Sequence, residues 1–180
     1  MDISKMTLKE KSNLLKRIGV ETNIYKALVK EKDLIYETVK DNYIIGLIGC
    51  PKEYKKDKDF MLKLIHVNSM SFNYVDETLL EDKSFLLKAV KENGNILYSL
   101  SKTFKNDEEI VKAAIKNTPQ SLQFASDRIK NKKEIVLLAL NLSNDRSLLK
   151  FASKKIQKEL KDYKIKKGEN KKQIRAEHVL

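Results

Sequence analysis

Apolar residues recur along the middle of the chain in blocks that repeat every 25 residues. Four segments start at Asp57, Asp82, Asp107 and Lys132 and read DKDFMLKLIHVN, DKSFLLKAVKEN, DEEIVKAAIKN and KKEIVLLALN. Their apolar residues fall at positions i, i+1, i+4 and i+5, which lie on one face of an α-helix. The pattern therefore predicts four related helices of about ten or eleven residues each.

The four predicted helices share the same apolar columns. These columns are Phe60, Phe85, Ile110 and Ile135; Met61, Leu86, Val111 and Val136; Leu64, Ala89, Ala114 and Ala139; and Ile65, Val90, Ile115 and Leu140. Columns that stay in register through four copies predict a continuous core, in which each copy packs mainly against its neighbours.

Residues suited to capping stand at both ends of these helices. The aspartates that begin three copies are predicted N-caps, because a carboxylate accepts hydrogen bonds from the first amides of a helix. Asparagines are predicted to close the helices in a left-handed conformation, with Gly94 after one of them. The closing residues are Asn68, Asn93 and Asn117.

A second apolar set follows each predicted helix and indicates a shorter second helix. One of its columns is Phe72, Leu97 and Leu122. Phe60, Phe85, Tyr74 and Phe124 are assigned to core columns rather than to a surface, whereas Tyr25, Tyr36, Tyr43 and Tyr54 are less constrained. In the last copy two extra residues lengthen the turn between the two helices.

The pattern weakens toward the N-terminus. Residues 31–42 align with residues 57–68 as a degenerate copy, and Pro51 is expected to begin or interrupt a helix in its second half. Upstream, Thr7 and Glu10 have the spacing of a capping box, Gly19 is a stop signal, and a second helix is expected from about residue 22.

These patterns predict an all-α fold, a short α-solenoid of tandem helical hairpins with roughly ten helices. Two prolines and five glycines in 180 residues are too few for a turn-rich sheet protein. The predicted single domain has capping helices at 1–30 and repeats at 31–157, followed by a basic helix and tail at 158–180. The repeats divide at 31–56, 57–81, 82–106, 107–131 and 132–157.

The repeated unit resembles the helical repeats of the domain of unknown function 4116 family. The stretches that carry the resemblance are DKSFLLKAVKENGNIL, KNDEEIVKAAIKNTPQSLQFAS and IKNKKEIVLLAL. The resemblance covers about residues 57–157, and more weakly begins at residue 31. It implies tandem helical repeats of a kind found in bacteria, large viruses and protists. It implies no activity and supplies no catalytic residues.

The net charge of +12 raises the question of nucleic-acid or membrane-surface binding. Only four of the 37 cations are arginine, the side chain best suited to phosphate and base recognition. Lysines concentrate after residue 153, where ten cations stand against four acids. A candidate electrostatic arm, set against a purely solubilising cap, comprises Lys164, Lys166, Lys167, Lys171, Lys172 and Arg175.

Catalytic and metal chemistry find little support in the sequence. His66 occupies a solvent-facing column, and His178 is the third residue from the end of the chain. Cys50 is the only cysteine and is expected to be buried. Phosphate-loop, dinucleotide-binding, nucleophile-elbow and zinc-protease motifs do not occur. We therefore expect no catalytic residues, no cofactor and no metal site, and no enzymatic activity.

The function predicted from the sequence is a non-enzymatic helical-repeat module that mediates protein–protein interaction. The alternative is a nucleic-acid-binding module that uses the lysine-rich faces and the basic tail, and a third hypothesis is an effector that sequesters a host protein. No apolar run is long enough to span a membrane, and no Sec-type signal peptide is visible. The predicted location is cytoplasmic, or outside the cell after export by another route.

Overall fold

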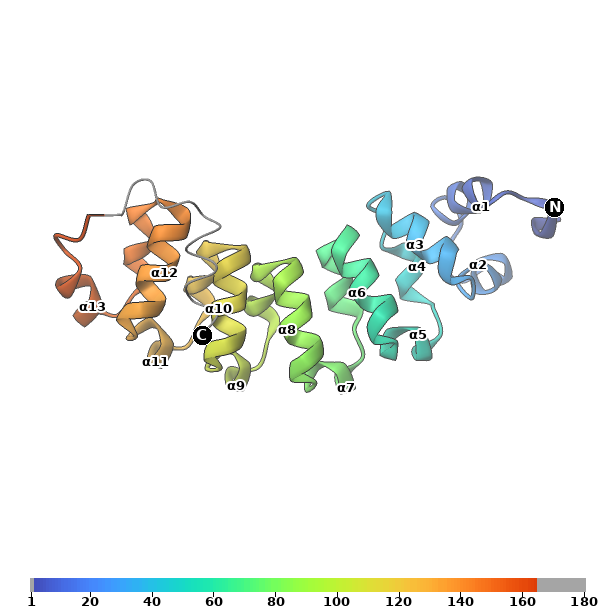
Figure 1. Ribbon diagram of the computed structural model, residues 1–180. Helices are drawn as coiled ribbons and strands as arrows, with labels where there is room; N and C mark the ends of the chain where they lie inside the picture. Colours follow the sequence, from blue (N-terminus) through green and yellow to red (C-terminus); the bar gives the residue numbers. More distant parts are fainter. Residues whose placement is uncertain (1, 165–180) are drawn as a thin grey trace. The chain divides into compact units, whose positions relative to one another are not determined.

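The structure is a computed structural model that describes residues 2–164. Within these residues all regular structure is helical, which confirms the all-α prediction (Figure 1). The described chain contains thirteen α-helices and five 3-10 helices, more and shorter elements than the roughly ten helices predicted. It divides into two compact units, of which the first ends at Phe85 and the second begins at Leu86.

The first unit contains the N-terminal helices, the degenerate copy and the first full copy. Its elements are η1 (Ile3–Lys5), α1 (Leu8–Leu15), α2 (Asn23–Leu28), α3 (Lys32–Lys40), α4 (Ile45–Ile48), α5 (Lys52–Lys56), α6 (Lys58–Val67), η2 (Ser69–Tyr74), α7 (Glu77–Leu80) and the first turn of α8 (Lys83–Glu92). Helix α3 is central, because α1, α4 and α6 all pack against it.

The second unit contains the rest of α8 and the remaining copies. Its further elements are η3 (Gly94–Ser99), α9 (Lys102–Lys105), α10 (Glu108–Asn117), η4 (Pro119–Phe124), α11 (Asp127–Lys130), α12 (Lys133–Ser143), η5 (Arg146–Phe151) and α13 (Lys154–Glu159). Helix α10 packs against α12 and against the 3-10 helices η3 and η4, and Figure 1 shows α10 and α12 side by side.

The start and the length of the long helices agree with the sequence prediction. Helices α6, α8 and α10 have ten residues each, and α12 has eleven. Asp57 accepts a hydrogen bond from the Phe60 amide, and Asp107 accepts from the Ile110 amide, so both act as N-caps. The predicted capping box at Thr7 is also formed.

The shorter second helix predicted in each copy is divided into two helical elements. A six-residue 3-10 helix follows each long helix, then one extended residue, and then a short α-helix that begins at a new N-cap. Ser126 is such a cap and accepts a hydrogen bond from the Ile129 amide. An N-cap residue requires an extended backbone, so a cap at this place prevents one continuous α-helix.

The predicted left-handed helix ends are wrong for Asn68, Asn93 and Asn117. Asn117 is the last residue of α10 and has no positive φ. The φ angles of Asn68 and Asn93 are −152° and −147°, and each of these two side chains caps the 3-10 helix that follows. The backbone is extended there because the chain turns directly into the next helix. Among the described non-glycine residues, φ is positive at Asn42 (68°) and at Asn144 (54°), where the lengthened turn of the last copy begins.

Every residue of the four predicted apolar columns is buried, and Cys50 is buried as predicted. Two aromatic assignments were wrong: Tyr74 and Phe124 are only half-buried, because they lie at the surface ends of the 3-10 helices. Tyr25, expected to be less constrained than the core aromatics, is 1% exposed. Its hydroxyl donates to the Ile45 carbonyl (2.5 Å) and accepts from the Gly49 amide (3.2 Å), which fixes the ring in the core.

Backbone hydrogen bonds join the short helices of neighbouring copies. The Asp76 amide donates to the Lys55 carbonyl in the first unit (3.0 Å). In the second unit the amide of the Ser126 cap donates to the Lys105 carbonyl (2.9 Å). Within the described part of the chain, no helix is long and apolar enough to cross a membrane.

Candidate functional site

The first unit has an open groove between α3 and α6, with a volume of about 830 Å³. The two helices are one copy apart and expose equivalent faces to it. Helix α3 contributes Lys32, Asp33 and Tyr36, and α6 with its cap contributes Asp57, Asp59, Phe60, Leu62, Lys63 and His66. The groove therefore combines apolar side chains with charges of both signs.

Lys32 forms an ion pair and two aromatic contacts at one side of the groove. Its Nζ lies 2.5 Å from Asp57 Oδ2, and the same ammonium stands over the rings of Tyr54 (4.9 Å) and Phe60 (5.2 Å). The Lys32 hydrogen bond holds the pKa of Asp57 below its usual range, and the hydrogen bond from the Phe60 amide adds to this effect. This corner is a fixed ion pair backed by aromatic rings.

The charge of the groove differs from that of the whole chain. Three carboxylates stand against two ammonium groups in its lining, with His66 counted as neutral, whereas the chain carries +12. Asp33 and Asp59 are exposed and flank the half-buried Tyr36 and Leu62. The groove is thus a slightly acidic, partly apolar surface on a strongly basic protein.

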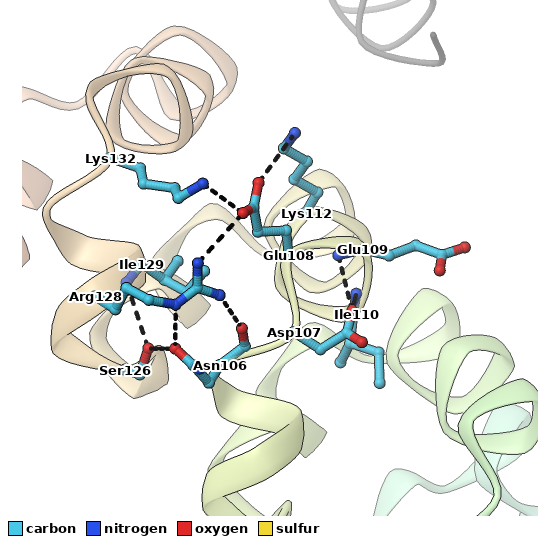
Figure 2. A network of polar contacts seen from close by, with 10 residues as sticks. All are labelled: Asn106, Asp107, Glu108, Glu109, Ile110, Lys112, Ser126, Arg128, Ile129 and Lys132. Carbon is cyan, nitrogen blue, oxygen red and sulfur yellow. Dashed lines mark hydrogen bonds and ion pairs between the residues drawn. The ribbon is translucent and has the colours of Figure 1, made fainter.

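A polar network joins successive copies in the second unit (Figure 2). Glu108 forms ion pairs with Lys132, with Arg128 (3.5 Å) and with Lys112 (3.9 Å). Arg128 also donates from Nε to Asn106 Oδ1 (2.8 Å) and from Nη2 to the Asn106 carbonyl (2.6 Å). Lys132 lowers the pKa of Glu108 through its hydrogen bond. The charged and polar groups of the two copies pair with one another, so the network stabilises the packing of these copies.

In the ion pair between successive copies, the positions of the positive and the negative side chain are exchanged in the second unit. In the first unit a lysine at the first helical position pairs with the aspartate that caps the next copy, as in Lys32–Asp57 and Lys58–Asp82. In the second unit the same two positions hold Glu108 and Lys132. Both members have exchanged charge, so the attraction is retained while the order of the charges is inverted.

The residues predicted for the basic arm are mostly beyond the described range. Lys164 is exposed, and the other five, as well as His178, lie outside the described residues. His66 is exposed as predicted and lies at the groove between α3 and α6. Among residues 2–164, no group of three His, Cys, Asp or Glu side chains is placed to hold a metal ion.

Two groove residues, Tyr36 and Leu62, were missed as functional candidates by sequence reasoning. They are 26 residues apart, the step that relates the degenerate copy to the next, and they occupy one column beside the buried face. The same column holds Leu87, Lys112 and Leu137 in the later copies. A column of mostly large apolar residues next to the buried face was the available signal.

The repeated helical units define an all-α helical-repeat protein. The chain belongs to the family described as Domain of unknown function (DUF4116), whose model matches residues 31–80, 82–130 and 107–157. Each match spans about two of the 25-residue copies, and the first includes the degenerate copy. No curated protein and no solved structure matches the chain.

Proposed function

We propose that the protein is a non-enzymatic helical-repeat module that binds another protein through the groove between α3 and α6. The observation that carries the proposal is the composition of this groove. Aromatic and aliphatic side chains next to charges of both signs are typical of surfaces that bind protein segments, in which tyrosine often contributes a large share of the affinity.

The groove argues against a nucleic acid as its ligand. A nucleic-acid site neutralises a row of phosphates with cations, but Asp33, Asp57 and Asp59 give this lining a small net negative charge. A phosphate backbone would therefore find no row of cations in this groove. The basic character of the chain is located elsewhere and does not define this site.

The same charges indicate the chemistry of the partner. Asp33 and Asp59 are exposed at the groove and are able to accept hydrogen bonds from a guanidinium or ammonium group. Tyr36 and Leu62 offer apolar contact beside them. The expected ligand is a protein segment that places an arginine or lysine next to an apolar side chain.

The proposal that the groove is not catalytic rests on its carboxylates. A general acid at neutral pH needs a raised pKa, usually produced by burial. Asp57 has a lowered pKa, and its oxygens are engaged by the Lys32 ammonium and the Phe60 amide. This carboxylate serves as a helix cap.

A peptide-display selection on the full chain tests the proposed ligand chemistry. We expect enriched peptides to carry arginine or lysine beside an apolar residue, and the Asp59→Lys variant to lose binding to them. Glu134→Lys is the matched control, because Glu134 is exposed and occupies the column of Asp59 in another copy. Enrichment of acidic peptides, or equal binding by both variants, would refute the groove as the site.

Capture from lysate separates the two classes of partner. A protein-binding module retains a discrete partner after nuclease treatment, and Tyr36→Ala reduces that retention. Loss of all captured material on nuclease treatment would favour the nucleic-acid alternative, which also predicts a steep decrease in binding with salt.

A further inference from the structure

A row of 3-10 helices in the last three copies exposes aromatic side chains. Helix η3 packs against η4, and η4 packs against η5. Tyr98 of η3 is 67% exposed, the largest exposed fraction among the large apolar side chains that the structure describes. Phe124 ends η4 and Phe151 ends η5, and both side chains are half-buried. The row therefore presents one aromatic ring from each of three successive copies.

Ammonium groups lie close to two of these rings. Lys105 Nζ lies 5.6 Å from the centroid of the Tyr98 ring, and Lys150 Nζ lies 5.0 Å from that of Phe151. The Tyr98 and Phe124 rings meet edge to face, with their centroids 5.3 Å apart. These contacts place a positive charge beside an aromatic ring twice along the row.

Positive charge in the last three copies is concentrated in the 3-10 helices and the short helices that follow them. These segments hold nine cations and three acids, in residues 94–106, 119–131 and 145–159. The long helices with their caps hold seven cations and six acids, in residues 82–93, 107–118 and 132–144. The segments of the first unit that correspond to the 3-10 and short helices hold three cations and four acids, in residues 43–56 and 69–81. The excess of cations thus belongs to the segments that carry the three aromatic rings.

The acids of these segments lie outside the 3-10 helices, because η3, η4 and η5 contain no acidic residue. Asp145 caps η5 and accepts a hydrogen bond from the Ser147 amide at 2.8 Å. Glu159 pairs with Lys133 at 3.9 Å, and Asp127 is exposed at the start of α11. The row is basic even when all three acids are counted.

Seven of the nine cations are lysines. The two arginines are bonded to neighbouring oxygens: Arg128 donates to Asn106 Oδ1, and Arg146 donates to the Leu160 carbonyl. Lys102 and Lys154 are the first residues of α9 and α13, and both are exposed. Lysine is a point charge on a flexible stem, so these side chains favour contacts with a phosphate backbone over recognition of particular bases.

We propose that this row of 3-10 helices binds a single-stranded nucleic acid. Its bases stack on the accessible rings, and its phosphates lie beside the lysines of the short helices. Aromatic platforms within a basic surface bind single strands because every base has a flat face, whereas a duplex keeps its bases stacked on one another. Two residues separate the end of each 3-10 helix from the next short helix, so the carbonyl end of one dipole is close to the amide end of another. The local backbone therefore does not oppose a phosphate.

The charge of the row distinguishes this ligand from a protein segment. Exposed aromatic side chains also occur in surfaces that bind proteins, but the core of such a surface is depleted of charged residues. Nine cations against three acids favour a polyanion instead. The row belongs to the second unit, and the proposal does not rest on the groove between α3 and α6.

Fluorescence anisotropy with the full chain and a labelled uridine oligomer of about ten nucleotides tests the proposal. We expect saturable binding at low salt that weakens steeply as salt is added. Tyr98→Ala should weaken binding about tenfold through the loss of one stacked base, and Tyr98→Phe should retain it. Tyr43→Ala is the matched control, because Tyr43 is an exposed tyrosine of the first unit with Lys16 Nζ at 4.9 Å from its ring centroid.

The salt dependence of binding tests the lysines. Lys150→Gln should reduce the slope of log affinity against log salt by about 0.7, the value for one phosphate contact with a single strand. Lys88→Gln should leave the slope unchanged, because Lys88 is an exposed lysine of the long helix α8. The basic segment after residue 164 is present in every variant, so differences between variants report on the row.

A deoxyuridine oligomer of the same length identifies the sugar. Tighter binding of one oligomer names RNA or DNA as the preferred strand, and equal binding shows that the sugar is not read; each of these results supports the site. Three results would overturn the proposal: no binding at low salt, a duplex that binds as tightly as the single strand, or equal affinities of Tyr98→Ala and Tyr43→Ala. If the oligomers do not bind and Tyr98→Ala instead loses a nuclease-resistant partner, the row binds a protein and the proposal is wrong.

Discussion

Replacing Gly94 with alanine should destabilise the second unit by a predictable amount. Gly94 is buried at the start of η3, and a methyl group there would lie 2.3 Å from the Ala114 carbonyl oxygen and 2.9 Å from the Thr118 Cβ. An ordinary contact begins at 3.4 Å, so η3 and α10 would have to separate by about 1.1 Å at this point. Close approach, and not a left-handed backbone, therefore explains this glycine.

Neither side of the contact is free to move. The Ala114 carbonyl accepts the hydrogen bond of the Thr118 amide at 2.8 Å, and the Gly94 amide donates to Asn117 Oδ1 at 2.9 Å. Overpacking costs about 1–3 kcal/mol, and a weakened buried hydrogen bond about 1 kcal/mol more. Loss of glycine flexibility in the unfolded chain offsets up to about 1 kcal/mol. We expect a net loss of about 2–3 kcal/mol.

Urea unfolding followed by circular dichroism measures this loss. With a slope of about 2 kcal/mol per molar urea, the midpoint should fall by about 1 M or slightly more. Gly19→Ala is the matched control, because no atom lies within 4 Å of a methyl group at Gly19. Its stability should change by less than about 0.5 kcal/mol. Equal midpoints for the two variants would show that the contact is not a constraint on η3.

Three further changes test other features of the fold. Ser121→Ala should raise the melting temperature, because the Ser121 hydroxyl is buried and has no hydrogen-bond partner among the described residues, at a cost of about 1 kcal/mol; a lower melting temperature would contradict this. The pKa of Asp82 is lowered by its hydrogen bond with Lys58, so the stability from this pair is present above the ordinary pKa of 3.8 and is lost as pH falls further. Asp82→Asn should therefore lose less stability than the unaltered chain in acid titrations monitored by thermal melting. Glu108→Lys should lower the melting temperature and the added change Lys132→Glu should restore part of it, whereas simple addition of two losses would refute the importance of their pairing.

The sequence was sufficient to predict the long helices because their signals are local. Asp57 and Asp107 begin helices as predicted, since a carboxylate next to free amides is stabilised by geometry within one turn. The 3-10 helices were not predicted, because their apolar spacing is close to that of an α-helix. Only the caps of the short helices, such as Asp76 and Ser126, contain the signal for the break, and the extended residue before each cap follows from it.

The candidate groove was less accessible from the sequence. Tyr36 and Leu62 share a column, but their contact with a common depression depends on how α3 packs against α6. Periodicity assigns residues to faces of single helices, whereas grooves form between helices, so the copies had to be placed in space before the groove was visible.

The reversed ion pair at Glu108 and Lys132 restricts how such a gene is able to lose copies by recombination. Deleting residues 82–106 would place Lys58 opposite Asp107, which preserves an attractive pair. Deleting residues 107–131 would instead place Lys83 opposite Lys132 and bring two positive charges together. Descendants that have lost one copy should therefore lack residues 82–106 more often than residues 107–131. Glu108 and Lys132 are expected to be inherited together.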